Sequence, residues 1–393
     1  MGFLPLDRLG THETSPGVVH FGVLLPWVSG ADGHRLTLKI IHERDQFLQP
    51  IAPLEFDLVH SVDPQYGDYW SIQIPIRPAD RPHPDSAWGL TGTYVYRYQL
   101  HSPLVDQPID WIVDPYAREF GVGQLSAFTL GYQPYQWSPQ EARWRTPQLH
   151  QLVVYELMLN EFGGSTEGAI AHLPYLADLG VNCVEVMPVS NVALEVDWGF
   201  LPLGYFGVDE RFGNRASFQR FVDVAHQNGI AVMVDSVYGH TSDTFAYQYL
   251  YSRLGYHENP FMGSFAKDYF GCSTDFNRTL TQDFFLTVNS HWLETYHVDG
   301  FRYDCVPNYW DGPTGNGYAK LTWATRELVK SNRGTGFWQR FDDGSRLIQC
   351  AEQLEDPVGV LWQSYSNCTW QYGTLGAAEA VAHGAPGSLT EFG

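Results

Sequence analysis

The chain has 393 residues, of which 44% are hydrophobic and 15% aromatic, so it is long enough for two domains with a substantial core. It carries 23 basic and 44 acidic residues, a formal charge of −21, and no Lys/Arg run, which argues against a nucleic-acid partner. Five cysteines are few and odd in number, which does not indicate a disulfide framework.

The N-terminus MGFLPLDRLG lacks the charged and then apolar pattern of a signal peptide. No run reaches the roughly 18 apolar residues of a membrane span, so we expect no membrane partner. Cys183, Cys305 and Cys350 each lie in an apolar strand-like run, where a reduced cysteine serves as a small hydrophobic residue. A cytoplasmic protein is the expectation.

The first 130 residues read as an all-β domain. The runs TLKII (37–41), WSIQIPI (70–76) and TYVYRYQL (93–100) contain β-branched and aromatic residues in partial alternation, separated by turns rich in Pro, Gly and Asp. Two sheets packed as a sandwich would bury such strands. We therefore predict a β-sandwich over residues 1–130, followed by a connector over 131–151 that is rich in Pro, Gln and Trp.

From residue 152 onward, apolar strand-like runs alternate with amphipathic helical patterns. This alternation indicates a parallel α/β architecture, and a (β/α)8 TIM barrel over residues 152–393 is the leading candidate. A closed barrel needs eight strands, so the pattern predicts a barrel truncated after about strand 5 or 6. The predicted strands lie in 153–159, 181–189, 230–237, 300–304 and 346–353, with a sixth near 368–372, and the predicted helices in 168–180, 217–229, 283–297 and 317–330.

Polar residues follow three of these strands, at the ends where barrel enzymes place their catalysis. Asp235 and His240 follow one strand, Arg302 and Asp304 end the next, and Glu352 ends the strand after that. Residues two apart on a strand point the same way, so Arg302 should lie beside Asp304 and keep it ionised, as a nucleophile requires. Partial desolvation would raise the pKa of Glu352, which suits a general acid.

Neighbouring strands lie about 4.8 Å apart, so carboxyl groups on their ends can reach the roughly 5–5.5 Å spacing of retaining glycosidases. Taken alone, each residue has a simpler explanation. Asp235 and Glu352 could cap a loop or turn, Arg302 and Asp304 could form a buried ion pair, and His240 could be a hydrogen-bonded loop histidine. Their joint occurrence at successive strand ends favours catalysis.

These residues lie in segments that resemble the short conserved regions of the α-amylase superfamily, glycoside hydrolase family 13. A further segment resembles one found in branching enzymes and isoamylases, and two N-terminal segments resemble the immunoglobulin-like, starch-binding domain of those enzymes. The segments are VDSVYGH (234–240), VDGFRYD (298–304), LIQCAEQ (347–353), then DWGFLPLGYFGVDERFG (197–213), and finally TYVYRYQL (93–100) and DPYAR (114–118).

The resemblance implies an enzyme acting on an α-glucan, namely starch, glycogen or a maltooligosaccharide, without a cofactor. It implies Asp304 as nucleophile, Glu352 as acid/base and Arg302 as the residue that orients the nucleophile. The segment 242–280 would be an excursion that walls the cleft. The implied substrate-binding residues are Asp235, His240, Phe200, Trp198 and Tyr205.

The sequence departs from the family pattern in three places. Gly239 replaces an Asn that binds calcium in many family members, so no metal is expected there. Phe200 replaces a sugar-stacking Tyr and keeps the ring without the hydroxyl. The family's fourth region, an H-D pair, does not occur before Gly393, because His383 is followed by Gly384. A chain cut short is the simplest account, and an open barrel would leave unpaired strand edges.

Three hypotheses follow. The first is an active α-glucan enzyme, either a hydrolase or a 1,4-α-glucan branching transferase. The second is a glucan-binding protein or fragment without catalysis, motivated by the absent fourth region. The third, a nucleotide- or metal-dependent α/β enzyme, has no G-x-G-x-x-G after the first strand, no P-loop and no metal-spaced Cys/His cluster to support it.

Overall fold

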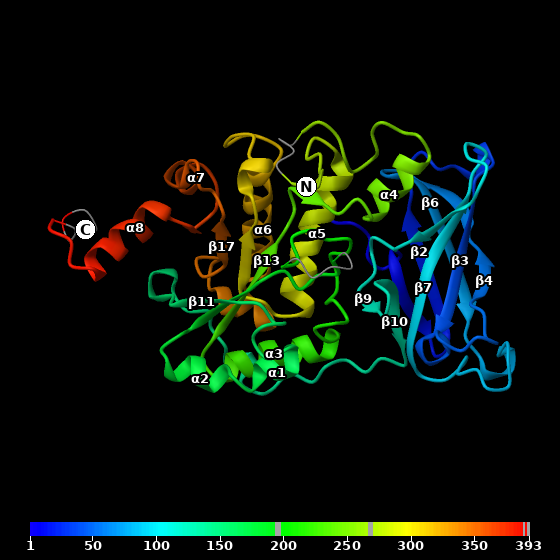
Figure 1. Ribbon diagram of the computed structural model, residues 1–393, viewed down its shortest axis with the longest axis horizontal. Coiled ribbons are helices and arrows are strands. Elements are labelled where there is room, and N and C mark those ends of the chain that lie inside the picture. The colour runs from blue at the N-terminus through cyan, green and yellow to red at the C-terminus, as the bar shows by residue number, and fades with distance from the viewer. Residues whose placement is uncertain (193–197, 266–269, 388–389, 391–393) are drawn as a thin grey trace.

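The computed structural model describes residues 1–192, 198–265, 270–387 and 390. Figure 1 shows a β-rich region at one end, a parallel sheet with its helices in the middle, and helix α8 at the other end. Among the described residues, no helix combines the length and the apolar character needed to cross a membrane.

The N-terminal region consists of two antiparallel sheets, with strand orders β1-β2-β6-β5 and β4-β3-β7-β10-β9, and β8 paired to β7. Phe21 from the first sheet and Leu38 and Tyr96 from the second are fully or almost fully buried in one shared core. The β-rich region predicted from the sequence is therefore confirmed, while its exact boundary at residue 130 stays a prediction. The strands are β1 (Gly10–Ser15), β2 (Val18–Leu24), β3 (Arg35–His42), β4 (Leu54–Asp57), β5 (Val59–Asp63), β6 (Gly67–Pro75), β7 (Gly92–His101), β8 (Ile109–Ile112), β9 (Glu119–Gly121) and β10 (Leu125–Leu130).

The second region is built on a six-stranded, all-parallel sheet with the order β11-β12-β13-β16-β17-β18. Alternate residues such as Val184 and Val232 join the large core that contains the helices, while Cys183 and Met233 form a smaller cluster on the opposite, inner face. The predicted barrel-type α/β fold is confirmed as a partial barrel, and the sixth strand is present. Its strands are β11 (Val154–Leu157), β12 (Cys183–Val186), β13 (Ala231–Ser236), β16 (Gly300–Tyr303), β17 (Ile348–Ala351) and β18 (Cys368–Thr369).

One predicted helix is broken in two. The apolar spacing over 168–180 predicted a single helix, but the structure has α1 and α2 with a break at Ala171 and His172. Pro174 has no amide hydrogen to donate to the preceding turn, so it can sit only at the start of a helix. The helices are α1 (Thr166–Ile170), α2 (Leu173–Asp178), α3 (Arg215–Gln227), α4 (Ala246–Arg253), α5 (Thr279–Thr295), α6 (Tyr318–Asn332), α7 (Pro357–Gln363) and α8 (Tyr372–Ala382).

The excursion 242–280 connects the parallel sheet to the N-terminal region. Its helix α4 packs against β8, and the hydroxyl of Tyr247 donates a hydrogen bond to Leu24 O at 2.9 Å. The excursion returns through β15 (Cys272–Ser273), which pairs with β14 (His240–Thr241). Residues 266–269 of the excursion lie outside the described residues.

A buried ionic cluster ties the connector to the base of the parallel sheet. Glu141 accepts from His226 Nδ1 and from His297 Nδ1, each at 2.7 Å, and His226 Nε2 lies 2.9 Å from Asp299 Oδ2. Burial lowers the pKa of His226, but the two carboxylates outweigh it and raise that pKa to about 9. Arg340, also fully buried, faces the same Asp299. The charged form of His226 is therefore favoured in the folded state.

This cluster predicts a pH dependence of stability. The pKa of His226 rises on folding from 6.5 to about 9, so its contribution is complete below pH 6.5 and is lost as pH rises toward 9. We expect His226→Gln to remove about 3 kcal/mol of stability at pH 6 and to flatten the decline between pH 6.5 and 9. Urea denaturation between pH 6 and 9 measures the free energy of unfolding, and His150→Gln, at an exposed histidine, is the control. An undiminished decline in His226→Gln would contradict the assignment.

Gly300 begins β16 at a position where no side chain fits. A Cβ at this position would lie 2.0 Å from Ile348 O on the neighbouring strand β17. We expect Gly300→Ala to force β16 and β17 apart and to destabilise the protein by about 2–3 kcal/mol. Gly334→Ala is the control, because its Cβ would meet no atom within 4 Å. Equal thermal midpoints for the two variants would show that the sheet accommodates the methyl group.

Candidate active site

The strand register brings the predicted catalytic residues together. Asp235 on β13 is paired with Arg302 on β16, and Arg302 is paired with Cys350 on β17. Asp304 follows Arg302 by two residues, and Glu352 follows Cys350 by two residues on the neighbouring strand. Because side chains two residues apart on a strand point to the same face, Asp304 and Glu352 lie side by side on the inner face of the sheet. Their proximity therefore follows from in-register pairing of parallel strands.

Arg302 is the centre of the site and is 2% exposed. Its Nη1 lies 2.8 Å from Asp235 Oδ1 and 2.8 Å from Asp304 Oδ1, and its Nη2 lies 3.2 Å from Glu352 Oε2. The ring of Trp370 stands 4.2 Å from the guanidinium carbon. One buried cation thus holds the three predicted carboxylates in a fixed arrangement.

The electrostatics of the two facing carboxyl groups differ. Burial raises the pKa of both Asp304 and Glu352, and Arg302 lowers both. The neighbouring Glu352 lowers the pKa of Asp304 while the neighbouring Asp304 raises that of Glu352, which favours a proton on Glu352 over one on Asp304. The raised pKa expected for Glu352 is found. Burial outweighs the lowering effect of Arg302 on Asp304, so the net shift of its pKa is upward, and the expectation that Arg302 keeps Asp304 ionised stays a prediction.

The chain turns sharply after Asp304. Cys305 has φ 41° and ψ 53°, a left-handed conformation that a non-glycine residue adopts at a cost of about 1 kcal/mol or more. Its backbone N–H donates to Glu352 Oε2 at 2.7 Å. The strained turn thereby fixes the carboxylate of Glu352, and no sequence pattern had pointed to this contact.

The strand ends open into a cleft of about 830 Å³. Trp198 is 60% exposed at its mouth, so its ring is available to a ligand. Aromatic faces beside a few carboxylates are the usual lining of a sugar site. The lining residues are Glu156, Met187, Trp198, Phe200, Leu201, His240, Phe270, Gly271, Arg302, Asp304, Cys305, Pro307, Glu352, Leu354, Glu355 and Trp370.

His240 borders this cleft as a neutral side chain. Burial lowers its pKa, and its Nε2 lies 2.8 Å from Phe200 O, to which it donates. Its Nδ1 has no hydrogen-bond partner among the described residues and is therefore left as an acceptor. The side chain is 1% exposed, so this nitrogen is not open to the cleft in this structure.

Two predicted substrate-binding residues lie outside the cleft. Tyr205 is 2% exposed and packs against Phe284 and Phe285 in the core, and its hydroxyl donates to His240 O at 3.3 Å. A ring enclosed in this way cannot stack on a sugar. The prediction of direct contact is corrected, since Tyr205 supports the segment that carries His240.

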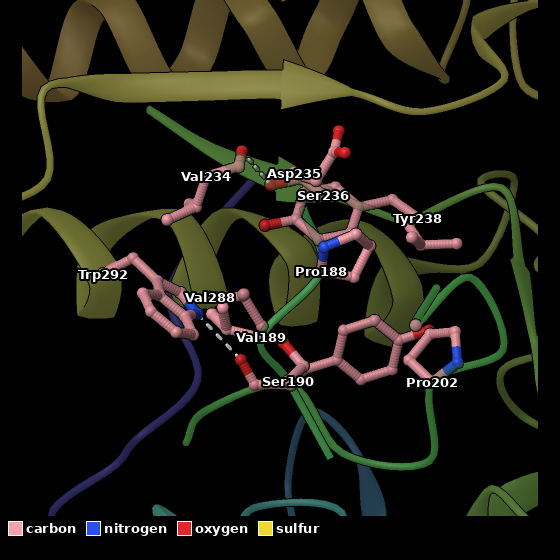
Figure 2. Close-up of a pocket in the computed structure, with 13 residues that line it drawn as sticks. Pro188, Val189, Ser190, Pro202, Val234, Asp235, Ser236, Tyr238, Val288 and Trp292 are labelled. Atoms are coloured by element: carbon pink, nitrogen blue, oxygen red, sulfur yellow. Dashed lines mark hydrogen bonds between the residues drawn. The ribbon is translucent and has the colours of Figure 1, made fainter. Parts of the chain in front are cut away.

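Asp235 is the second correction. Its side chain is fully buried at the edge of a small enclosed pocket, about 10 Å³, that lies below the site. Figure 2 shows its carboxylate pointing away from Pro202 and Trp292, which line that pocket. The carboxylate is directed instead to Arg302. Asp235 therefore forms an ion pair with the guanidinium of Arg302, and its side chain does not reach the cleft.

The sequence analysis missed two acidic residues of the inner face. Glu156 on β11 and Glu185 on β12 are paired in register, and with Asp235 they offer ligand atoms within 4.8 Å of one another. Glu185 Oε1 lies 3.8 Å from Arg302 Nε, and burial raises the pKa of Glu185 to about 7. Even spacing of polar residues along otherwise apolar strands was the signal that could have found them. Arg302 already supplies positive charge here, and the absence of a metal stays a prediction.

The space beside Gly239 is taken by another residue. Asn308 Nδ2 donates to Gly239 O at 2.8 Å, and a Cβ on residue 239 would lie 3.0 Å from the side chain of Asn308. A larger side chain at 239 therefore needs Asn308 to move. This contact explains why glycine is accommodated at the position where the family pattern has Asn.

Comparisons with known proteins show which family the chain is similar to. Residues 133–274 match the family model described as "Alpha amylase, catalytic domain". The chain is 31% identical over 242 residues to the 1,4-alpha-glucan branching enzyme GlgB of Nitrosomonas eutropha, covering 55% of this chain and 31% of that protein. It is 28% identical over 323 residues to the GlgB of Lactiplantibacillus plantarum, covering 78% of this chain and 46% of that protein.

Among solved structures, the chain resembles the Group B Streptococcus pullulanase SAP in complex with maltotetraose. The TM-score is 0.62 at 18% identity, covering 88% of this chain and 45% of the pullulanase, so this likeness concerns the fold. The chain spans about a third to a half of the length of the curated relatives described above. Residues 133–274 thus resemble the catalytic domain of the α-amylase superfamily, the chain is similar in sequence to branching enzymes, and it shares its fold with a pullulanase.

Proposed function

We propose that the protein acts on α-linked glucans by a retaining mechanism, with Asp304 as nucleophile and Glu352 as general acid/base. The observation that carries the proposal is that Arg302 holds both carboxyl groups, Asp304 Oδ1 at 2.8 Å and Glu352 Oε2 at 3.2 Å, at the floor of an aromatic cleft. Carboxyl groups on adjacent, in-register strand ends fit the roughly 5–5.5 Å spacing of retaining enzymes better than the roughly 6.5–9.5 Å gap that an inverting enzyme needs for its water. Burial and the neighbouring Asp304 raise the pKa of Glu352, which favours Glu352 as the proton donor.

In the first step, the carboxylate of Asp304 attacks the anomeric carbon while Glu352 gives its proton to the departing glycosidic oxygen. A covalent glycosyl–Asp304 ester forms and the bond to the leaving sugar breaks. In the second step, the Glu352 carboxylate takes a proton from a hydroxyl group, whose oxygen displaces Asp304. Water as acceptor gives hydrolysis, and a sugar hydroxyl gives transfer.

Arg302 is assigned to orienting Asp304, because one guanidinium nitrogen contacts both Asp304 and Asp235 at 2.8 Å. Trp198 and Phe200 are assigned to stacking on the sugar, and neutral His240 to the wall of the cleft beside Phe200. These groups recognise a neutral ligand, in keeping with starch, glycogen or a maltooligosaccharide. Five free cysteines fit a reducing cytoplasmic compartment, where we place the protein.

A branching transferase is the second candidate, favoured by the two GlgB relatives. Incubation with amylose separates the candidates when reducing ends and iodine staining are followed together. New reducing ends indicate hydrolysis, and a loss of staining with few new ends indicates transfer. Retained glucan binding without either change would leave a glucan-binding protein and would contradict the catalytic proposal.

The role of Glu352 is tested with a substrate that needs no acid. We expect Glu352→Gln to lose at least about 1,000-fold in kcat on amylose, because the leaving oxygen then receives no proton. With maltosyl fluoride, whose fluoride leaves unprotonated, the same variant should still form the glycosyl ester on Asp304 and accumulate it. Intact-protein mass spectrometry detects that adduct, and Asp304→Asn is the control that should show none. An adduct in Asp304→Asn would remove Asp304 from the mechanism.

The pH profile provides a separate check. Burial and the neighbouring Asp304 raise the pKa of Glu352, so the protonated acid persists above pH 4.5 and is lost as pH rises through the raised value. We expect the alkaline limb of kcat/KM on amylose to report this loss. In Glu352→Gln acting on maltosyl fluoride, the rate of adduct formation should not fall along that limb. A limb that persists unchanged in this variant would assign it to another group.

A further inference from the structure

A second concave site lies beside the start of α6, outside the cleft. It is a depression of about 380 Å³ between the loop after β16, α6 and the end of α7. We call it the rim pocket. Its lining residues are Pro313, Thr314, Gly315, Asn316, Ala319, Lys320, Trp323, Gln363 and Tyr365.

The rim pocket presents two aromatic rings at its surface. Trp323 on α6 is 45% exposed, and Tyr365, just after α7, is 43% exposed. The backbone of Tyr365 is held from both sides, since its N–H donates to Thr322 Oγ1 at 3.3 Å and its carbonyl accepts from Gln349 Nε2 at 3.0 Å. The ring of Tyr365 is therefore carried on a fixed backbone, as a stacking surface requires.

The polar lining of the rim pocket is neutral or already paired. Gln363 and Thr314 are exposed and supply an amide and a hydroxyl group. The lining includes no carboxylate, although the chain has 44 acidic residues. Lys320, its one charged member, donates to Gln282 Oε1 at 2.7 Å and to Asn316 Oδ1 at 3.2 Å. Aromatic faces with uncharged hydrogen-bonding groups suit a neutral polyhydroxyl ligand.

The rim pocket and the cleft share one loop. Pro307 lines the cleft and Pro313 lines the rim pocket, in the segment between β16 and α6. Six residues span at most about 20 Å. A polymeric chain held in the rim pocket would therefore stay close to the catalytic carboxylates.

We propose that the rim pocket is a second binding site for α-glucan, which holds glucosyl units of a polymer while the cleft engages a reacting bond. The inference rests on the proposed function for its ligand class. A second site of this kind raises the local concentration of polymer at the cleft and offers nothing to a ligand too short to reach both.

The test compares two exposed tryptophans, one that lines the rim pocket and one that does not. Trp323→Ala removes the stacking ring of the rim pocket, and Trp362→Ala removes an 84% exposed ring that does not line it. Affinity electrophoresis in glycogen gels, and kcat and KM on amylose and on maltosyl fluoride, are measured for the unaltered chain and both variants. Circular dichroism checks that each variant is folded.

We expect Trp323→Ala to weaken glycogen binding about tenfold and to raise KM for amylose, since one stacking contact is lost. Rates on maltosyl fluoride should stay within about twofold, and Trp362→Ala should match the unaltered chain. Gln363→Ala, which leaves both rings in place, should weaken binding to a smaller degree.

If Trp323→Ala binds glycogen as tightly as the unaltered chain and turnover is intact, the rim pocket is not a glucan-binding site, while the proposed catalytic function is unaffected. Equal losses in Trp323→Ala and Trp362→Ala overturn it as well, because they would reflect general adhesion of exposed rings. If the unaltered chain neither binds nor converts any α-glucan, the proposed function fails, and the rim pocket fails with it.

Discussion

The arrangement of the site depends on one buried guanidinium. Arg302 contacts Asp235 and Asp304 at 2.8 Å and Glu352 at 3.2 Å, at a position where water is almost excluded. Isolated carboxylates at such depth would be too costly to keep charged. One cation cannot neutralise three carboxylates, and burial raises the pKa of both Asp304 and Glu352, with the neighbouring Asp304 adding to the rise at Glu352. The division of roles proposed for the two residues is consistent with this local excess of negative charge.

The scaffold enforces this arrangement through backbone geometry. In-register pairing of β13, β16 and β17 sets the heights of the catalytic side chains, and Gly300 permits the close approach of β16 and β17. The left-handed turn at Cys305 then donates its amide to Glu352. Far below, the cluster around His226 fastens the connector to the same sheet. The sheet that carries the strained turn is thus also held by buried charged contacts.

The ligand-facing surfaces share a chemistry that differs from the rest of this acidic protein. In the cleft, rings such as Trp198 surround the carboxylates that are proposed to react, and in the rim pocket the rings stand beside neutral amide and hydroxyl groups. The first arrangement fits the cleavage of a bond, and the second fits the holding of a chain. A glucan enzyme that works on polymers benefits from both, since binding energy far from the reacting bond keeps the substrate in place.

The amino-acid sequence by itself determined the fold class, the candidate catalytic residues and the approach of Asp304 and Glu352, because each depends on alternation along strands and on the order of neighbouring strands. Pro174 also carried the signal for the break between α1 and α2, which helical spacing alone concealed. Only the tertiary structure decided that Tyr205 and Asp235 lie beneath the cleft. It also decided that Glu185 joins the site and that burial raises the pKa of Asp304 despite Arg302. Exposure and desolvation depend on segments far apart in the chain, so no local pattern encodes them.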